Sequence, residues 1–327
     1  MKTTSLALTA ALLLVLVCLT PLAVTKAEPV QRPIQGLWVW HHEWYVDDAY
    51  RAEMFRFAQE HGYNLLMVQV HLDESSGRPE LAYPNEFRTL IIEAAELGIS
   101  VEALDGEKDM AMQRNWPRTF AILDLILDFN ASLPEGSKLA GIHYDIEPYI
   151  KPEWRESQAV RDQIMLDLLA YFDQAKARIE ASQQNLTLAA DIPFWYDSKT
   201  EEGDSCIITY RGETKNLHKH IQDICDYIGI MSYRQRAVGP NSVTSVVENE
   251  LAYAEEIGKF ILASLETVEL TDTPQITFYG MSPEAFWNTH HEVVRTLEGR
   301  PGFGGMLSHS YRGMRDLHGM SPFQRQH

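Results

Sequence analysis

The sequence predicts an α/β fold, a single (β/α)8 barrel that follows an N-terminal signal peptide. Eight short apolar segments alternate along the chain with helical patterns or long inserts. Strict alternation of this kind requires a parallel sheet, and eight repeats in roughly 300 residues favour a closed barrel. No linker rich in Pro, Gly and Ser divides the chain, so we predict one domain at 28–327. An open, doubly wound sheet is the alternative, but WVWHH at 38–42 stands where its glycine fingerprint would follow the first strand.

The N-terminal 27 residues have the pattern of a secretory signal peptide. Lys2 is followed by an apolar run at 6–19 and by the exit sequence Thr-Lys-Ala at 25–27. The run is too short to cross a bilayer comfortably, and no other long apolar run occurs in the chain. We therefore expect cleavage after Ala27 and a secreted or periplasmic protein that does not insert into the membrane once the signal is removed.

Composition and charge narrow the class of protein. The 327 residues are 45% hydrophobic and 23% charged and include only 3 Cys, which excludes disordered, collagen-like and disulfide-framework proteins. The formal net charge is −18, and it becomes −20 once Lys2 and Lys26 leave with the signal peptide. Such an excess of negative charge repels nucleic acid and anionic membranes. We expect an exported monomer that acts on neutral or cationic material and needs no cofactor.

Three stretches of the chain repeat one pattern, an amphipathic helix, a glycine and then an apolar strand. The helices are expected at 47–61, 86–97 and 243–257, the glycines are Gly62, Gly98 and Gly258, and the strands follow at 64–70, 100–104 and 259–265. Glycine just past the last helical turn accepts the left-handed conformation required there. Further apolar strands are predicted at 36–40, 138–145, 186–192, 227–233 and 302–307, and further helices at 153–184, 217–224 and 283–297.

Two cysteines, Cys206 and Cys225, remain after the signal peptide. In an oxidising compartment they could pair, and closing the short loop between them would stabilise the fold by about 3 kcal/mol. We expect this disulfide, and two separate buried thiols are the alternative.

Ionisable and aromatic side chains stand at the carboxyl end of every predicted strand, where barrels of this kind carry their chemistry. In chain order these ends carry Trp40, His41 and His42; His71, Asp73 and Glu74; Asp105 and Glu107; His143, Asp145 and Glu147; Asp191, Trp195 and Tyr196; Tyr233 and Arg234; Glu266; and His309, Tyr311 and Arg312. The aromatic rings favour a sugar substrate, because sugar rings stack on such platforms between polar groups. We expect the substrate to contact Trp40, His71, Asp105, Glu107, His143, Asp191, Trp195, Tyr196, Arg234 and His309.

The fourth strand end carries the most distinctive pattern. The strand period of two puts Gly141, His143, Asp145 and Glu147 on one face, about 6–7 Å apart per step. Mutual repulsion and partial burial would raise the pKa of at least one carboxyl group, and such a group can act as an acid near neutrality. The alternative is a buried ladder of ion pairs with Arg234 or Arg312.

Three short motifs lie at the ends of the fourth, sixth and eighth strands: DIE at 145–147, MSY at 231–233 and GGML at 304–307. In order and spacing they resemble the Asp-x-Asp-x-Glu, Met-x-Tyr and Gly-Gly-Val-Met motifs of family 18 glycoside hydrolases, the chitinase and endo-N-acetylglucosaminidase group. The resemblance implies a TIM barrel that cleaves an oligo- or polysaccharide containing N-acetylhexosamine. It implies that Glu147 is the general acid, that Asp145 orients the substrate acetamide, whose oxygen attacks the sugar carbon, and that Tyr233 holds this acetamide.

The chain departs from the family pattern at four places. His143 replaces the first Asp of the signature, DGE at 105–107 replaces Ser-x-Gly-Gly after the third strand, and Arg234 stands where Asp or Asn is usual. Ser308 or His309 stands where the family has its pocket-floor Trp. These departures are typical of a distant relative whose substrate differs.

Three other functions remain open. Glu147 and Glu266, which end the fourth and seventh strands, resemble the acid/base and nucleophile of two-glutamate retaining glycosidases, whose carboxyl groups lie about 5–5.5 Å apart. A metal-dependent hydrolase would use His41, His42, His71, Asp105 and His143, which lie on successive strand ends, as metal ligands, although no metal-ligand motif supports it. The third is a barrel that binds glycans without cleaving them, and the presence of both Asp145 and Glu147 argues against it.

Overall fold

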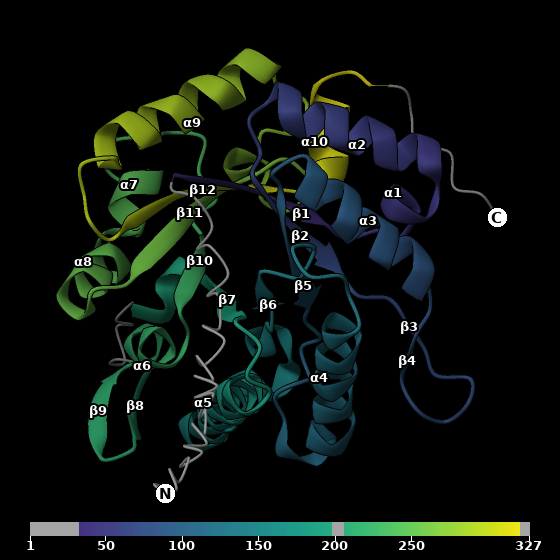
Figure 1. Cartoon of the computed structure of the whole chain (residues 1–327). Coiled ribbons are helices and arrows are strands. Elements are labelled where there is room, and N and C mark those ends of the chain that lie inside the picture. Colours follow the sequence, from purple (N-terminus) through teal and green to yellow (C-terminus); the bar gives the residue numbers. More distant parts are fainter. Residues whose placement is uncertain (1–32, 198–205, 321–327) are drawn as a thin grey trace, which may run out of the picture.

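The computed structural model describes residues 33–197 and 206–320 (Figure 1). Eight parallel strands close into a barrel in the order β1-β12-β11-β10-β7-β6-β5-β2. They are β1 (Ile34–Val39), β2 (Leu65–Gln69), β5 (Ser100–Asp105), β6 (Gly141–Tyr144), β7 (Thr187–Pro193), β10 (Tyr227–Met231), β11 (Phe260–Glu266) and β12 (Phe303–His309). The predicted (β/α)8 barrel is confirmed, whereas the predicted signal peptide and its cleavage site lie outside the described residues.

Helices surround the barrel and follow its strands in turn (Figure 1). They are α1 (Glu43–Val46), α2 (Asp48–Glu60), α3 (Pro84–Glu96), α4 (Trp116–Ala131), α5 (Gln158–Ala181), α6 (Leu217–Ile224), α7 (Val243–Val246), α8 (Glu248–Ile257), α9 (Pro283–Leu297) and α10 (Tyr311–Leu317). The sequence predicted α2, α3, α5, α6 and α9 and the combined span of α7 and α8, but not α1, α4 or α10. None of the helices in this part of the chain has the length and apolar character needed to span a membrane.

Local signals in the sequence begin and end these helices. The Asp47 carboxylate accepts hydrogen bonds from the backbone N–H groups of Ala49 and Tyr50 and so caps α2. Gly62, Gly98 and Gly258 have φ angles of 73°, 71° and 70°, the left-handed conformation predicted for each of them. Helix ends and strand starts are therefore fixed by the residues that the sequence pattern singled out.

Two antiparallel hairpins interrupt the βα alternation, and the sequence did not predict either of them. One joins β3 (Leu72–Asp73) to β4 (Glu80–Leu81) after β2, and the other joins β8 (Ile207–Tyr210) to β9 (Glu213–Asn216) before α6. Both are inserts after the carboxyl end of a barrel strand, and they leave the parallel order of the barrel unchanged.

The two cysteines are not joined, and the predicted disulfide is wrong. Both side chains are buried thiols. The Leu217 backbone N–H donates to the Cys206 carbonyl at 2.8 Å, so Cys206 lies at the start of α6, while Cys225 caps the other end of this helix. The two cysteines thus lie at opposite ends of an eight-residue helix, which is about 12 Å long, whereas a disulfide joins Cα atoms no more than roughly 7 Å apart.

We expect thiol alkylation to distinguish these buried cysteines from a disulfide. In guanidinium without reductant, the peptides that contain Cys206 and Cys225 should both take up label, because nothing links the two sulfurs. In the folded protein both should stay unlabelled, because burial excludes the reagent and raises the pKa of the Cys225 thiol. Peptide mapping by mass spectrometry checks this, and a Cys206–Cys225 linked peptide would contradict it.

Candidate active site

Glu147 lies just beyond the carboxyl end of β6, at the start of a short 3-10 turn (Pro148–Ile150). The Tyr149 hydroxyl in this turn donates a hydrogen bond to Glu147 Oε1 at 2.8 Å. Burial raises the pKa of Glu147, the Tyr149 hydrogen bond and the nearby His309 imidazole lower it, and the net shift is upward. The pKa shift predicted for the fourth strand end thus has the expected direction. Tyr149, which the sequence analysis missed, is the residue that orients the carboxyl group.

Asp145 is the first residue after β6 and lies two residues before Glu147. Its pKa is raised well above the ordinary value, first by burial and then by the negative charges of Asp191 and Glu147. Among the described residues, its buried Oδ1 atom has no hydrogen-bond partner. Gly106, at the end of β5, packs directly against the Asp145 backbone, where a Cβ atom would lie 2.0 Å from the Asp145 carbonyl oxygen. The neighbouring strand end therefore fixes the position of Asp145.

A chain of charged groups lies inside the barrel beneath Asp145. His143 Nδ1 lies 2.9 Å from Glu102 Oε2, and His143 Nε2 lies 2.9 Å from Asp191 Oδ2. Burial lowers the pKa of His143, but the two carboxylates outweigh burial and raise this pKa to about 10. The imidazole is therefore a cation between two anions. The Trp38 indole N–H donates to Asp191 Oδ2 at 2.9 Å and so holds the upper end of the chain.

The buried group of Glu102, His143 and Asp191 corrects two expectations from the sequence. His143 is fully buried, so it lies below the barrel mouth and is not placed to contact a substrate. Its ionic partners are carboxylates on neighbouring strands, whereas Arg234 donates to Asn241 and to the Tyr233 carbonyl. The strand period placed His143 on the correct face, but depth along the strand decides whether a side chain reaches the mouth. Glu102, a charge in the middle of an apolar strand, was the signal that could have revealed this chain.

Glu266 and His309 form a second carboxylate–imidazole pair at the ends of β11 and β12. The backbone N–H groups of Thr267 and Val268 donate to Glu266 Oε1, each at 2.7 Å, and His309 Nδ1 lies 2.9 Å from Glu266 Oε2. The Trp40 indole N–H donates to His309 Nε2 at 2.8 Å. Both oxygens of Glu266 are thus engaged in holding the loop and the His309 ring.

Tyr233, beyond β10, lies beside this pair. Its ring centroid is 6.0 Å from that of His309. Burial raises the pKa of Tyr233, and the charges of Glu266 and Asp145 raise it further, so its hydroxyl stays a neutral donor. The structure therefore brings the four residues predicted to be catalytic, Glu147, Asp145, Tyr233 and Glu266, to one end of the barrel.

The aromatic residues after β7 differ in what they can contact. Trp195 is half-buried, and its ring centroid lies 5.0 Å from that of Tyr149, which places it next to Glu147. Tyr196 is only 1% exposed and packs against Trp154. Trp195 is available as a platform for a substrate ring, whereas Tyr196 supports it from below, which corrects the prediction that Tyr196 contacts the substrate.

Three further predicted contacts lie away from Glu147 or are engaged elsewhere. Asp105 follows the inward-facing Glu102 and Leu104 at odd spacing, so it faces the helices near Tyr144, and burial raises its pKa to about 6. Glu107 is exposed and lies 3.8 Å from Arg118. His71 Nε2 lies 3.2 Å from the Trp40 carbonyl oxygen, and burial lowers the His71 pKa to about 4.

Of the side chains considered for a metal site, His42 and His71 lie 4.9 Å apart between ring centroids, but they are not part of a larger group of ligands among the described residues. In residues 33–197 and 206–320, no group of three or more His, Cys, Asp and Glu side chains is arranged to hold a metal ion. His143, in particular, has both ring nitrogens beside carboxylates inside the barrel.

No family model matches the chain, and no curated protein matches it. Solved structures resemble it in fold. A chitinase from Rhizomucor miehei superposes with a TM-score of 0.53 at 13% sequence identity, over 86% of this chain and 97% of that chain. A chitinase from Chromobacterium violaceum gives a TM-score of 0.50 at 14% identity, over 85% of this chain and 93% of that chain. A GH113 β-1,4-mannanase gives a TM-score of 0.51 at 10% identity, over 86% and 88%. The distant resemblance to chitinase-type glycoside hydrolases is thereby confirmed at the level of the fold, a (β/α)8 barrel.

Proposed function

We propose that the protein is a glycoside hydrolase that cleaves a glycan containing N-acetylhexosamine, with Glu147 as the general acid. The observation that carries this proposal is the pair of carboxyl groups at the end of β6. Both Asp145 and Glu147 have raised pKa values, the charge of Glu147 acts on Asp145, and Tyr149 orients Glu147. A carboxylic acid that keeps its proton near neutrality can protonate the oxygen of a glycosidic bond.

The neighbours of Glu147 support attack by the substrate acetamide. A protonated Asp145 keeps a free oxygen that can accept the acetamide N–H, while its own proton lies toward Asp191 or Glu147. The neutral Tyr233 hydroxyl can donate to the acetamide oxygen and so aim that oxygen at the sugar carbon. As Glu147 gives up its proton, the bond to the leaving sugar breaks and the acetamide oxygen bonds to the same carbon. Water then bonds to this carbon and gives a proton to the Glu147 carboxylate, while the bond from the carbon to the acetamide oxygen breaks.

The structure supports the acetamide route over the two-glutamate route at Glu266. A nucleophilic carboxylate needs an oxygen that is free to attack, whereas Glu266 accepts two backbone N–H groups on Oε1 and lies against His309 on Oε2. We assign Glu266 the role of holding His309, and with it Trp40, at the mouth of the barrel.

A matched pair of substrates tests the proposal. Chromogenic β-linked N-acetylglucosamine and glucose oligosaccharides that share one leaving group differ only in the acetamide. We expect release of the chromophore from the N-acetylated compound alone, because the glucoside lacks the attacking oxygen. Equal cleavage of both would contradict substrate assistance, and cleavage of neither, nor of mannan or chitin, would contradict the proposed hydrolase.

The hydrogen bond from Tyr149 to Glu147 leads us to predict how the pH dependence of activity changes in a Tyr149 variant. Tyr149→Phe removes a donor that stabilises the charged form of Glu147, so the pKa of Glu147 should rise further. A general acid works below its pKa, and the alkaline limb of kcat/KM should therefore move to higher pH. Measuring kcat/KM from pH 4 to 9 checks the direction, and Tyr210→Phe, on the remote hairpin, serves as the control. A shift to lower pH would contradict this role of Tyr149.

A further inference from the structure

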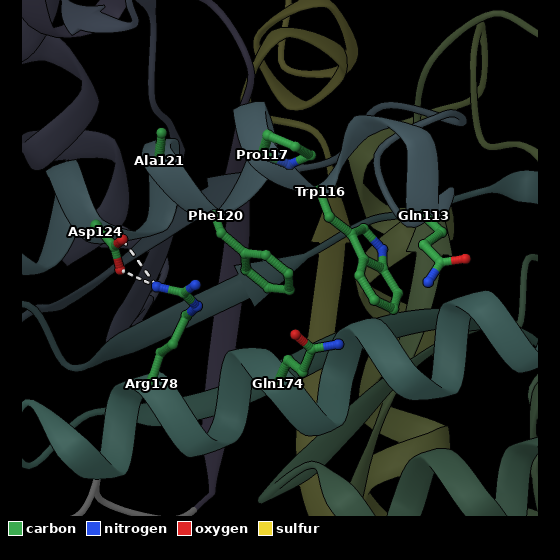
Figure 2. A pocket seen from close by; sticks show the side chains of 8 residues that line it. All are labelled: Gln113, Trp116, Pro117, Phe120, Ala121, Asp124, Gln174 and Arg178. Atoms are coloured by element: carbon green, nitrogen blue, oxygen red, sulfur yellow. Dashed lines mark hydrogen bonds and ion pairs between the residues drawn. The ribbon is translucent and has the colours of Figure 1, made fainter.

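A groove on the outside of the barrel lies between α4 and α5 (Figure 2). Its volume is about 420 Å³, within the range of roughly 300–1,000 Å³ that small-molecule sites occupy. The side chains that line it include Gln113, Trp116, Phe120, Asp124, Gln174 and Arg178. None of them belongs to the candidate active site, and no role described above uses them.

The aromatic part of the groove is held rigidly. The Trp116 indole N–H donates to the Ala111 carbonyl at 2.7 Å, and the Trp116 and Phe120 rings lie 5.8 Å apart between centroids. The Arg178 guanidinium lies 4.6 Å from the Phe120 ring centroid, and Phe120 stacks on Tyr171. Trp116 remains half-buried, so part of its ring faces the groove. A fixed, partly exposed ring is the usual platform for the C–H face of a sugar.

The polar part of the groove suits an uncharged ligand. Arg178 and Asp124 pair with each other at 2.9 Å, so their charges cancel. The exposed amides of Gln113 and Gln174 each offer both a donor and an acceptor, which is what sugar hydroxyl groups require. The groove thus combines aromatic rings with paired charges, whereas the chain as a whole has a formal net charge of −18.

The groove is joined to the barrel mouth by a short fixed segment. Residues 106–115 lead from the end of β5 to the start of α4, and Gly106 at their beginning packs on Asp145. Lys151, four residues after Glu147, forms an ion pair with Asp109 in this segment, and the Gln113 backbone N–H donates to Asp167 on α5 at 3.2 Å. In a barrel the helix that follows a strand begins at the carboxyl end of the strands. The Trp116 end of the groove therefore lies on the side of the barrel that carries Glu147.

We propose that this groove is a second glycan-binding site, which holds a neutral polysaccharide while another part of the same chain lies in the barrel mouth. The inference rests on the proposed function for the identity of the glycan. It predicts that the groove contributes to the use of a polymer more than to the use of a short oligosaccharide, because only a long chain reaches both sites.

The test compares a polymer with a short substrate. For Trp116→Ala, we expect the ratio of insoluble chitin turnover to turnover of a soluble chromogenic N-acetylglucosamine disaccharide to fall about five- to tenfold, as for the loss of one well-placed aromatic contact. Gln174→Ala, at an exposed position that cannot compromise the fold, should lower the ratio in the same direction. Trp287→Ala, which removes a half-buried ring from α9, is the matched control and should leave the ratio unchanged. An unchanged ratio in both groove variants would overturn the proposal and leave the proposed hydrolase standing.

A binding experiment distinguishes failure of the groove proposal from failure of the proposed hydrolase. In the Glu147→Gln protein, we expect the fraction bound to insoluble chitin to fall when Trp116→Ala is added and not when Trp287→Ala is added. If the wild type cleaves no N-acetylglucosamine compound but retains this Trp116-dependent binding, the groove proposal stands and the proposed hydrolase fails. If binding of chitin, cellulose and mannan is the same with and without Trp116, the groove proposal fails whatever the activity.

Discussion

Glu147→Gln should lower kcat on a chromogenic N-acetylglucosaminide by about 10³-fold and leave the fold intact. Glutamine has nearly the same shape and can still accept the Tyr149 hydrogen bond, but it has no proton to give to the leaving oxygen. General acid catalysis contributes typically about 10²–10⁴-fold to the rate of an enzyme. Because the substitution leaves the packing around β6 unchanged, the melting temperature should stay close to that of the wild type.

Steady-state kinetics and thermal unfolding monitored by circular dichroism check both parts of this expectation. Glu156→Gln, an exposed glutamate nine residues farther along the chain, is the matched control and should retain full activity. Turnover that survives Glu147→Gln would contradict the acetamide route and the two-glutamate route together, since both use Glu147 as the acid.

Asp145→Asn should lower kcat by about 10²-fold, the second largest effect that we expect. Asparagine keeps the size of the side chain but cannot pass a proton on to Asp191, so it cannot become negatively charged beside the acetamide as this group turns positive during attack. Losing one such preorganised group costs about 10²–10³-fold in comparable sites. The loss should appear in kcat more than in KM, because the interaction strengthens only as the acetamide attacks.

Glu266 provides the contrast for the Asp145 variant. If Glu266 only positions His309, Glu266→Ala should lose less activity than Asp145→Asn, and sodium azide should not restore it. If Glu266 were the nucleophile, azide would take the place of the missing carboxylate and form a glycosyl azide. Detection of that product by mass spectrometry would contradict the acetamide route. Glu266 is 2% exposed, so the folded state of the variant must be verified by its unfolding transition.

The sequence predicted the barrel well because its signals are local. Glycines at 62, 98 and 258 adopt the left-handed conformation expected of them, and each is followed by a barrel strand. Helix α4 escaped prediction because apolar residues occupy so much of its circumference that no clear stripe appears. The hairpin β8–β9 was also missed, since each of its strands has only four residues.

The site could be predicted only in part, because its details depend on contacts between strands. Asp145 and Glu147 lie just beyond β6, which ends at Tyr144, and their charges interact as expected for neighbouring carboxyl groups. Asp105 was assigned to the mouth, although an odd spacing from Glu102 turns it toward the helices. The contacts of His143 with Glu102 and Asp191 were also missed, because these residues lie 41 residues before it and 48 residues after it along the chain and only the charge of Glu102 within an apolar strand points to them.

The buried trio of Glu102, His143 and Asp191 restricts how this barrel can change. Replacing the imidazole alone would leave two anions facing each other away from water, and breaking such a buried pair costs about 3–5 kcal/mol. Replacing either acid alone would leave the cation with one partner. Relatives that lost one member would have to exchange the other two at nearly the same time, so these three positions should vary together or not at all.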